Sequence, residues 1–168
     1  MATWIIIGTI LFIVGGIMGL KPSAKETRLD NLRMTARKVG LMPKLVACPA
    51  WLTGKTGERG KGMIAQYGLI LEDGTLPPCD FQIIDGEWRP MTDNFAANFA
   101  LDKKVVDFGE NITPTVQGLS CKANFICVYW YENGNMGNPA ILENTEKDLI
   151  LLKNTLQNLA DLVQNSKI

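Results

Sequence analysis

An uncharged apolar run near the start of the chain constrains its structure more than any other feature. From position 4 to position 20 the sequence reads WIIIGTILFIVGGIMGL, and Thr9 carries its one polar side chain. As a helix that rises 1.5 Å per residue, this run spans roughly 25 Å, near the short end of what a bilayer core requires. We therefore expect residues 1–21 to form one transmembrane anchor.

A cleaved signal peptide is the alternative to an anchor. Such a leader has a basic start, a short apolar core and small residues at a cleavage site. Here no basic side chain precedes the apolar run, no A-x-A-like site follows it, and no cysteine lies near residue 20 to mark a lipoprotein. The pattern favours an anchor that stays attached.

Glycines within the apolar run indicate where another helix would pack. Gly15 and Gly19 form a G-x-x-x-G motif, and Gly8 precedes them. Small residues at this spacing let two helices approach closely. We expect Gly8, Gly15 and Gly19 to pack against an integral membrane protein partner or against a second copy of the chain.

Basic residues dominate the segment that follows. The whole chain holds 17 Lys+Arg and 17 Asp+Glu, but residues 21–44 are rich in the former and the rest of the chain in the latter. Basic residues beside a span stay in the cytoplasm. This predicts a single-pass inner-membrane protein with its N-terminus outside and its C-terminal domain in the cytoplasm. The same residues either set this topology alone or also contact anionic membrane lipid; they are Lys21, Lys25, Arg28, Arg33, Arg37 and Lys38.

Residues 22–44 are expected to contain a basic amphipathic helix. Ser23 is a typical N-cap, with Glu26 as its capping-box partner, and Gly40 is a typical C-cap. The apolar side chains, Leu29, Leu32, Ala36 and Val39, are few and fall on one stripe. Packing on the following domain is therefore favoured over lying on lipid.

Residues 45–168 are expected to form one small α+β domain with a mainly antiparallel sheet. Alternation predicts strands at 62–71, 81–84, 87–90 and 104–108, with an Asp85-Gly86 hairpin turn between the second and third. The run ANFICVYWY, residues 123–131, is apolar on both faces and predicts a central strand that Asn133-Gly134 would end. Residues 92–101 are either a short helix or a loop.

A C-terminal amphipathic helix is expected after Thr145, with Asp148 as the capping-box partner. Its apolar stripe consists of Leu149, Leu152, Leu156, Leu159 and Val163. The stripe is too short for a coiled coil. Packing across the sheet is favoured, and binding a partner helix is the alternative.

The sequence offers little catalytic chemistry. The absence of histidine excludes Ser-His-Asp triads, Cys-His dyads and HExxH zinc helices. Cys48, Cys79, Cys121 and Cys127 lack zinc spacing; they are expected to be free thiols in a cytoplasmic domain and two disulfides otherwise. We predict no catalytic residue, no metal, no cofactor and no small-molecule substrate.

A glycine-rich segment is the remaining candidate for ligand binding. Pro49 stands where a phosphate-binding loop requires glycine, so nucleotide binding is not expected. Lys55, Arg59 and Lys61 lie among Gly54, Gly57, Gly60 and Gly62. They either contact phosphates of lipid or RNA or belong to a solvated loop. The balanced overall charge argues against a nucleic-acid binder of the basic kind.

The first 44 residues resemble the start of YajC, the small auxiliary subunit of the bacterial preprotein translocase. The features that match are the apolar run to Leu20, the Lys21-Pro22 pair and the basic helix that carries Lys25, Arg28 and Arg33. YajC continues after the proline with Gln-Gln-Lys, where this chain has Ser23-Ala24-Lys25. The resemblance implies a β-rich cytoplasmic domain and association with the translocase.

Together these features predict a non-enzymatic interaction or accessory subunit of a larger membrane assembly. The alternative is a membrane-tethered module that binds lipid or nucleic acid through the basic residues and the 55–61 loop. An enzyme that works without histidine is a third class.

Overall fold

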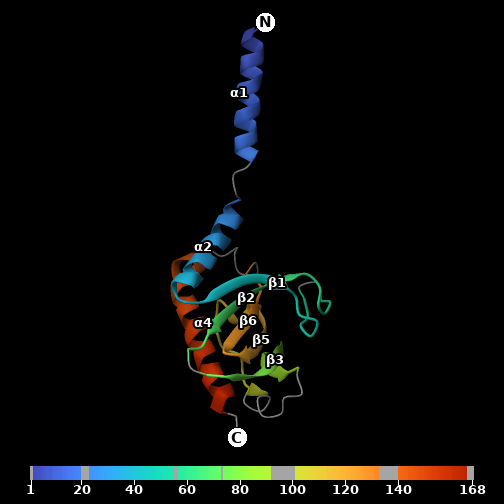
Figure 1. The fold of residues 1–168 in the computed structure, drawn as a ribbon, viewed down its shortest axis with the longest axis vertical. Coiled ribbons are helices and arrows are strands. Elements are labelled where there is room, and N and C mark those ends of the chain that lie inside the picture. Colours follow the sequence, from blue (N-terminus) through green and yellow to red (C-terminus); the bar gives the residue numbers. More distant parts are fainter. Residues whose placement is uncertain are drawn as a thin grey trace.

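The computed structural model describes residues 2–19, 23–54, 57–72, 74–91, 101–132 and 140–165. Within these residues the chain is α+β, with three α-helices and one antiparallel sheet (Figure 1). The elements are α1 (Ala2–Gly19), α2 (Ala24–Lys38), β1 (Met42–Ala47), β2 (Met63–Ile70), β3 (Leu76–Ile84), β4 (Glu87–Pro90), a 3₁₀ turn (Thr113–Thr115), β5 (Val116–Ala123), β6 (Phe125–Trp130) and α4 (Ala140–Asn165).

The described strands form a six-stranded sheet in the order β1-β2-β6-β5-β3-β4. All neighbouring pairs are antiparallel. The prediction of a central strand is confirmed, because β6 lies between β2 and β5 and is buried on both faces. Ile126, Val128 and Trp130 belong to the main core, whereas Cys127 and Tyr129 belong to a second cluster on the other face.

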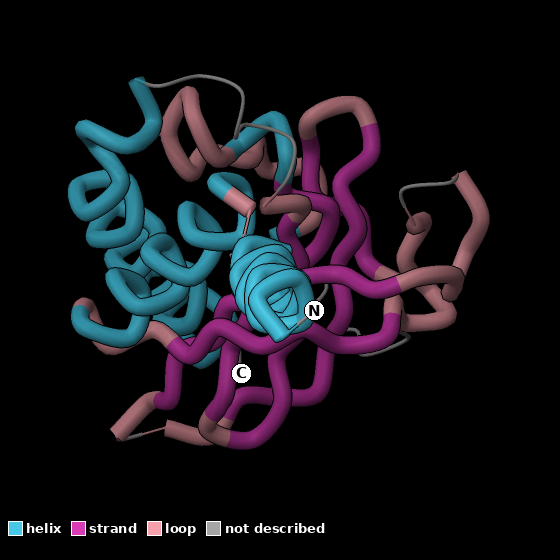
Figure 2. The backbone as a smooth tube through the Cα atoms, turned by 90° about the horizontal axis from the view of Figure 1, so that it is seen from above, coloured by secondary structure: helices cyan, strands magenta, loops and turns pink. Residues whose placement is uncertain are grey.

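Helices α2 and α4 cover the main-core face of the sheet, as Figure 2 shows from above. The segment from Cys48 to Gly54 covers part of the other face, where Leu52 is fully buried beside Ile64. The two helices also pack against each other. The expected domain boundary at residue 45 falls inside β1, so α2 and the sheet share one core.

The predicted caps of α2 are confirmed. The Ser23 hydroxyl accepts a hydrogen bond from the Glu26 amide, and the Glu26 carboxylate accepts one from the Ser23 amide. Gly40 has a φ of 92°, the left-handed conformation that a helix C-terminus requires. Leu32 and Ala36 are buried and Val39 packs against the core, so the helix lies on the domain as expected.

The Asp85-Gly86 turn is also confirmed. Both residues have positive φ, 54° and 78°. These values match a type I′ turn, whose twist suits the two strands that it joins. It places Glu87–Pro90 beside Phe81–Ile84 as predicted.

Several strand predictions are wrong. β1 and β5 were not expected, and the 104–108 segment makes only an isolated bridge, from Val105 to Glu87. The alternation of β5 is hidden because its register with β6 shifts between Val116 and Gly118. Asn133-Gly134 and most of the 92–101 segment lie outside the described residues.

The C-terminal helix is present but begins earlier than predicted. α4 starts at Ala140, so Thr145 lies inside the helix instead of capping it. Its stripe packs on the sheet and α2: Leu149, Leu152, Leu156 and Val163 are fully buried, and Leu159 is partly buried against the same core.

The predicted transmembrane anchor is wrong. α1 has 18 residues, which span about 27 Å, against a hydrocarbon core of about 30 Å. Across the residues with a described structure, no helix has both the length and the apolarity needed to cross a bilayer. The single-pass inner-membrane location, with an outside N-terminus and a cytoplasmic domain, is corrected with it.

Candidate functional site

Helix α1 exposes apolar side chains in every direction and stands apart from the sheet (Figure 1). Phe12 is 83% exposed and Trp4 is 79% exposed. The other large apolar side chains of this helix that are exposed are Ile5, Ile6, Ile7, Ile10, Leu11, Ile13 and Val14. A helix that is apolar all round is typically buried in its functional state. α1 is therefore the first candidate for a functional surface.

The three glycines singled out in the sequence share one face of α1. At 100° per residue, Gly8, Gly15 and Gly19 fall within a sector of about 40°. A side chain added at Gly8 or Gly15 would meet no described atom within 4 Å. Gly8 and Gly15 therefore border open space, and Ile10 lies on the opposite face of the same helix.

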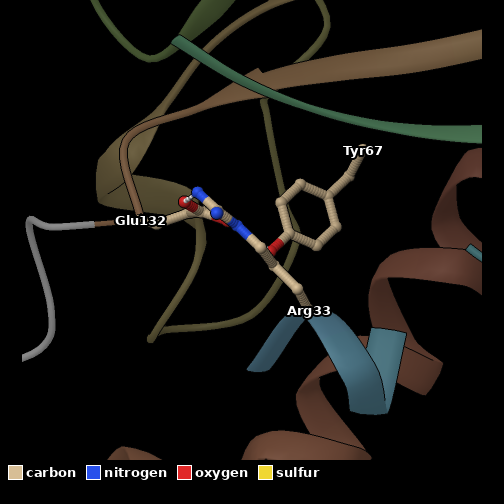
Figure 3. Close-up of polar contacts among 3 residues, drawn as sticks. All are labelled: Arg33, Tyr67 and Glu132. Atoms are coloured by element: carbon tan, nitrogen blue, oxygen red, sulfur yellow. Dashed lines mark hydrogen bonds and ion pairs between the residues drawn. The ribbon is translucent and has the colours of Figure 1, made fainter. Parts of the chain in front are cut away.

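A buried ionic cluster ties α2 to the sheet (Figure 3). Arg33 of α2 donates from Nε to Glu132 Oε1 at 3.0 Å and from Nη2 to Glu132 Oε2 at 2.6 Å. The Tyr67 hydroxyl of β2 donates to Glu132 Oε1 at 2.6 Å. Glu132 lies two residues after the end of β6 and is only 6% exposed. A two-point guanidinium–carboxylate pair fixes orientation as well as distance.

The electrostatics of this cluster favour a neutral Tyr67 hydroxyl and a charged Arg33 guanidinium. Burial and the nearby Glu132 carboxylate raise the pKa of the Tyr67 hydroxyl, so the hydroxyl stays a donor. The hydrogen bond to Glu132 raises the pKa of the Arg33 guanidinium. The Tyr67 ring also packs on Trp130, with centroids 4.9 Å apart. The cluster thus joins α2, β2 and the segment after β6 through hydrogen-bonded side chains in the C-terminal half of α2.

Sequence reasoning missed Glu132 and gave Arg33 another role. Arg33 was placed among membrane-facing basic residues, but it is paired inside the fold. Lys25, Arg28, Arg37 and Lys38 are exposed, and Lys21 lies outside the described residues. The available signal was a carboxylate directly after the most apolar strand, a position where an unpaired charge would be costly.

The 55–61 loop and the basic face of α2 are not brought together. They lie at opposite ends of β1, whose six residues span about 20 Å. Arg59 and Lys61 are exposed, and Lys61 Nζ lies 2.7 Å from Glu58 Oε2. Lys55 lies outside the described residues. The structure thus shows one partly neutralised loop and no combined basic surface.

The C-terminal stripe faces the interior of this chain. Leu149, Leu152, Leu156 and Val163 have no exposed surface. A partner helix has no access to that side of α4 while the sheet and α2 cover it. Exposed Ile150, Leu151 and Leu162 lie elsewhere on the helix.

All four cysteines are free and buried. On the face away from the helices, Gln66 Nε2 donates to Cys127 Sγ at 3.0 Å, and the Ser120 hydroxyl donates to Asp80 Oδ1 at 2.6 Å. Burial raises the pKa of Cys127 to about 11, so its thiol is neutral near pH 7. Within the described ranges no three acidic or cysteine side chains are grouped to hold a metal ion.

A shallow groove lies beside the β3–β4 turn. Its volume is about 320 Å³, and it is lined by Ile83, Gly86, Val106, Thr113, Pro114, Val116 and Gln117. The lining carries no charged side chain. Its polar side chains bond to the chain itself, because the Thr113 hydroxyl accepts from the Phe108 amide and Gln117 Nε2 donates to the Thr115 carbonyl oxygen, so they are not arranged to orient a small ligand.

Comparisons with protein-family models, curated proteins and solved structures gave no significant match. The resemblance of residues 1–44 to YajC therefore stays a prediction. Functional inference for this chain depends on the geometry of its own residues, above all on helix α1 and on the cluster that orients α2.

Proposed function

We propose that this chain is a non-enzymatic interaction or accessory subunit of a larger protein assembly, with helix α1 as its docking element. The observation that carries the proposal is the exposure of large apolar side chains all around α1. Burying one such side chain contributes about 1.5–3 kcal/mol. A helix of this kind has a strong driving force to insert among apolar helices of another protein.

The glycine row supplies the specificity of docking. Gly8 and Gly15 border open space, and together with Gly19 on the same helical face they would offer a groove at which a partner helix can approach α1 closely. The matching partner surface is a helix whose large side chains, such as Leu, Ile or Phe, fill the groove. Apolar surface alone would give nonspecific association, without a fixed orientation of α1 on its partner.

The Arg33–Tyr67–Glu132 cluster supports docking from inside the domain. It holds α2 against the sheet with charge-assisted hydrogen bonds. α2 directly follows the segment after α1, so a fixed α2 limits the positions from which α1 can reach a partner. The folded α+β domain would then be presented at a defined side of the assembly.

The test is affinity purification of the full-length protein in mild detergent, with the bound proteins identified and quantified. The proposal predicts a partner at fixed stoichiometry that is lost when residues 2–19 are deleted. Gly15→Leu should also lose it, because the substitution adds apolar surface but fills the groove. Ile10→Leu is the matched control, because it keeps apolar volume on the opposite face, and it should retain the partner.

Three results would overturn the proposal. The first is the absence of any stoichiometric partner with the full-length chain. The second is equal or stronger capture by Gly15→Leu, which would show that α1 binds proteins through unspecific apolar contact. A partner that binds equally well without residues 2–19 would assign docking to the α+β domain.

A further inference from the structure

Two of the four cysteines occupy directly opposite positions on neighbouring strands. Cys79 of β3 and Cys121 of β5 are register partners in the antiparallel ladder. Opposite residues in such a ladder have Cα atoms about 4.5–5.5 Å apart. A disulfide requires a Cα separation of about 4.4–6.8 Å. The backbone therefore holds this pair at a distance that a disulfide can span.

The side chains of the pair also meet. Both are almost fully buried in the main core, at 1% and 2% exposure, on the same face of the sheet. A hydrogen bond with Cys79, together with burial, raises the pKa of the Cys121 thiol. The Cys121 thiol therefore stays protonated near pH 7, and the Cys79 side chain is its register partner on the same face of the sheet.

The other two cysteines are excluded from this pairing by the sheet itself. Cys48 and Cys127 belong to the cluster on the opposite face. A bond from either of them to Cys79 or Cys121 would have to pass through the backbone layer. A metal ion is not the better occupant, because no third ligand joins the two thiols among the residues that the structure covers.

We propose that Cys79 and Cys121 form a specific oxidation site that closes to an intrachain disulfide between β3 and β5, while Cys48 and Cys127 stay thiols. The proposal does not depend on the docking role of α1. The closed bond would join the two strands covalently and enclose a loop of roughly 40 residues.

The oxidant that balances this step is a peroxide. One thiol sulfur attacks the peroxide, the O–O bond breaks, and a sulfenic acid and one water form. The second thiol sulfur then attacks the sulfenic sulfur. The S–S bond forms, the S–O bond breaks, and the oxygen leaves as a second water with the remaining thiol proton. The two thiols lose two electrons in total, and the peroxide gains them.

Because both thiols are buried, peroxide requires local opening of β3 to reach them. Among the described residues, the register pairs of β3 with β4 run from Phe81 to Ile84, and the Met91 amide donates to the Asp80 carbonyl oxygen next to them, so Cys79 is the residue just before this paired stretch. The β3–β5 ladder also shifts register between Leu76 and Cys79. A strand segment with such an irregular ladder opens at lower free energy than a continuous central strand. Peroxide reaches the thiols during these openings.

The test uses the purified full-length protein, reduced first and then treated with hydrogen peroxide at several urea concentrations below the unfolding transition. Remaining thiols are alkylated, and disulfide-linked peptides are mapped by mass spectrometry. Before alkylation, we expect the oxidised protein to be lighter than the reduced protein by two hydrogen atoms. After alkylation and digestion, Cys79 and Cys121 should be found in the linked peptides. The bond should raise the thermal midpoint by about 10 °C.

Cysteine variants distinguish the Cys79–Cys121 bond from oxidation of the other two cysteines. Cys48→Ser and Cys127→Ser should still form the bond, whereas Cys79→Ala and Cys121→Ala should not. The linkage in the unsubstituted chain decides the matter even if a variant folds poorly. The proposal is overturned if no linked Cys79–Cys121 peptide forms at any urea concentration, or if the main linkage contains Cys48 or Cys127.

Discussion

The ion pair between Arg33 of α2 and Glu132 yields a prediction in which removing either partner lowers the free energy of unfolding, but by unequal amounts. Arg33→Met removes the cation and leaves the Glu132 carboxylate, whose side chain is 5% exposed. Glu132→Gln removes the anion and leaves Arg33, whose side chain is 28% exposed and can reach water. The first change therefore leaves a buried carboxylate without its cation, whereas the second leaves a guanidinium that solvent can stabilise.

The expected magnitudes differ for this reason. Arg33→Met should lower the free energy of unfolding by about 3–4 kcal/mol, because the carboxylate keeps only the Tyr67 hydroxyl as a partner. Glu132→Gln should lower it by about 1–2 kcal/mol, because the amide oxygen can still accept the Tyr67 hydrogen bond. The double variant should lose about 1–2 kcal/mol as well, since it contains no uncompensated buried charge.

The assay is urea unfolding of the full-length protein and the three variants, followed by far-ultraviolet circular dichroism. The double-mutant cycle should give a coupling of about 3–4 kcal/mol, because the single losses together exceed the loss of the double variant by that amount. Additive losses in the double variant would refute the reasoning. So would a loss below about 1 kcal/mol for Arg33→Met, which is the range of an exposed pair.

Three further outcomes are expected. Leu156→Ala, at a fully buried position of α4, should lower the free energy of unfolding by about 2–5 kcal/mol, measured by urea unfolding. Burial raises the pKa of both Tyr67 and Tyr129. Their contribution to the free energy of unfolding is therefore complete below the unfolded-state pKa of about 10 and is lost as the pH rises above it. Tyr67→Phe should weaken this alkaline loss in unfolding curves between pH 8 and 11, and an unchanged dependence of the free energy of unfolding on pH would contradict it. Gly118→Ala should lower the thermal midpoint, because the new methyl group would lie 2.8 Å from the Phe81 carbonyl oxygen and cost about 1–3 kcal/mol; an unchanged midpoint would show that the strands move apart freely.

Local signals in the sequence predicted the elements that local physics determines. The capping box at Ser23 and Glu26 starts α2 where expected. The Asp85-Gly86 pair makes its hairpin because both residues accept positive φ. β6 is buried on both faces because its whole sequence is apolar, which is visible without knowledge of its neighbours.

Elements defined by distant contacts were missed. β1 is an edge strand that contains Pro43 and Lys44, and its exposure pattern shows no alternation to recognise. β5 carries a register shift that breaks its period. The start of α4 at Ala140 was missed because Thr145 and Asp148 match a capping box, which is typical of a helix start. Here the helix begins before that pattern.

The candidate site divides in the same way. The apolar helix and its glycines were visible as a pattern, but the transmembrane interpretation of that helix was wrong. The Arg33–Glu132 pair joins residues 99 positions apart. No local pattern predicts such a pair, because it depends on how α2 packs beside the end of β6.

The most direct test of the docking role of α1 is site-specific photocrosslinking in cells that produce the full-length protein. Phe12, which is 83% exposed, is replaced by a photoreactive phenylalanine analogue, with the same analogue at exposed Ile150 of α4 as the control position. The account predicts one discrete protein adduct from position 12, none from position 150, and loss of the adduct when Gly15→Leu is added. The absence of any protein adduct from position 12, or an adduct that persists with Gly15→Leu, would contradict it.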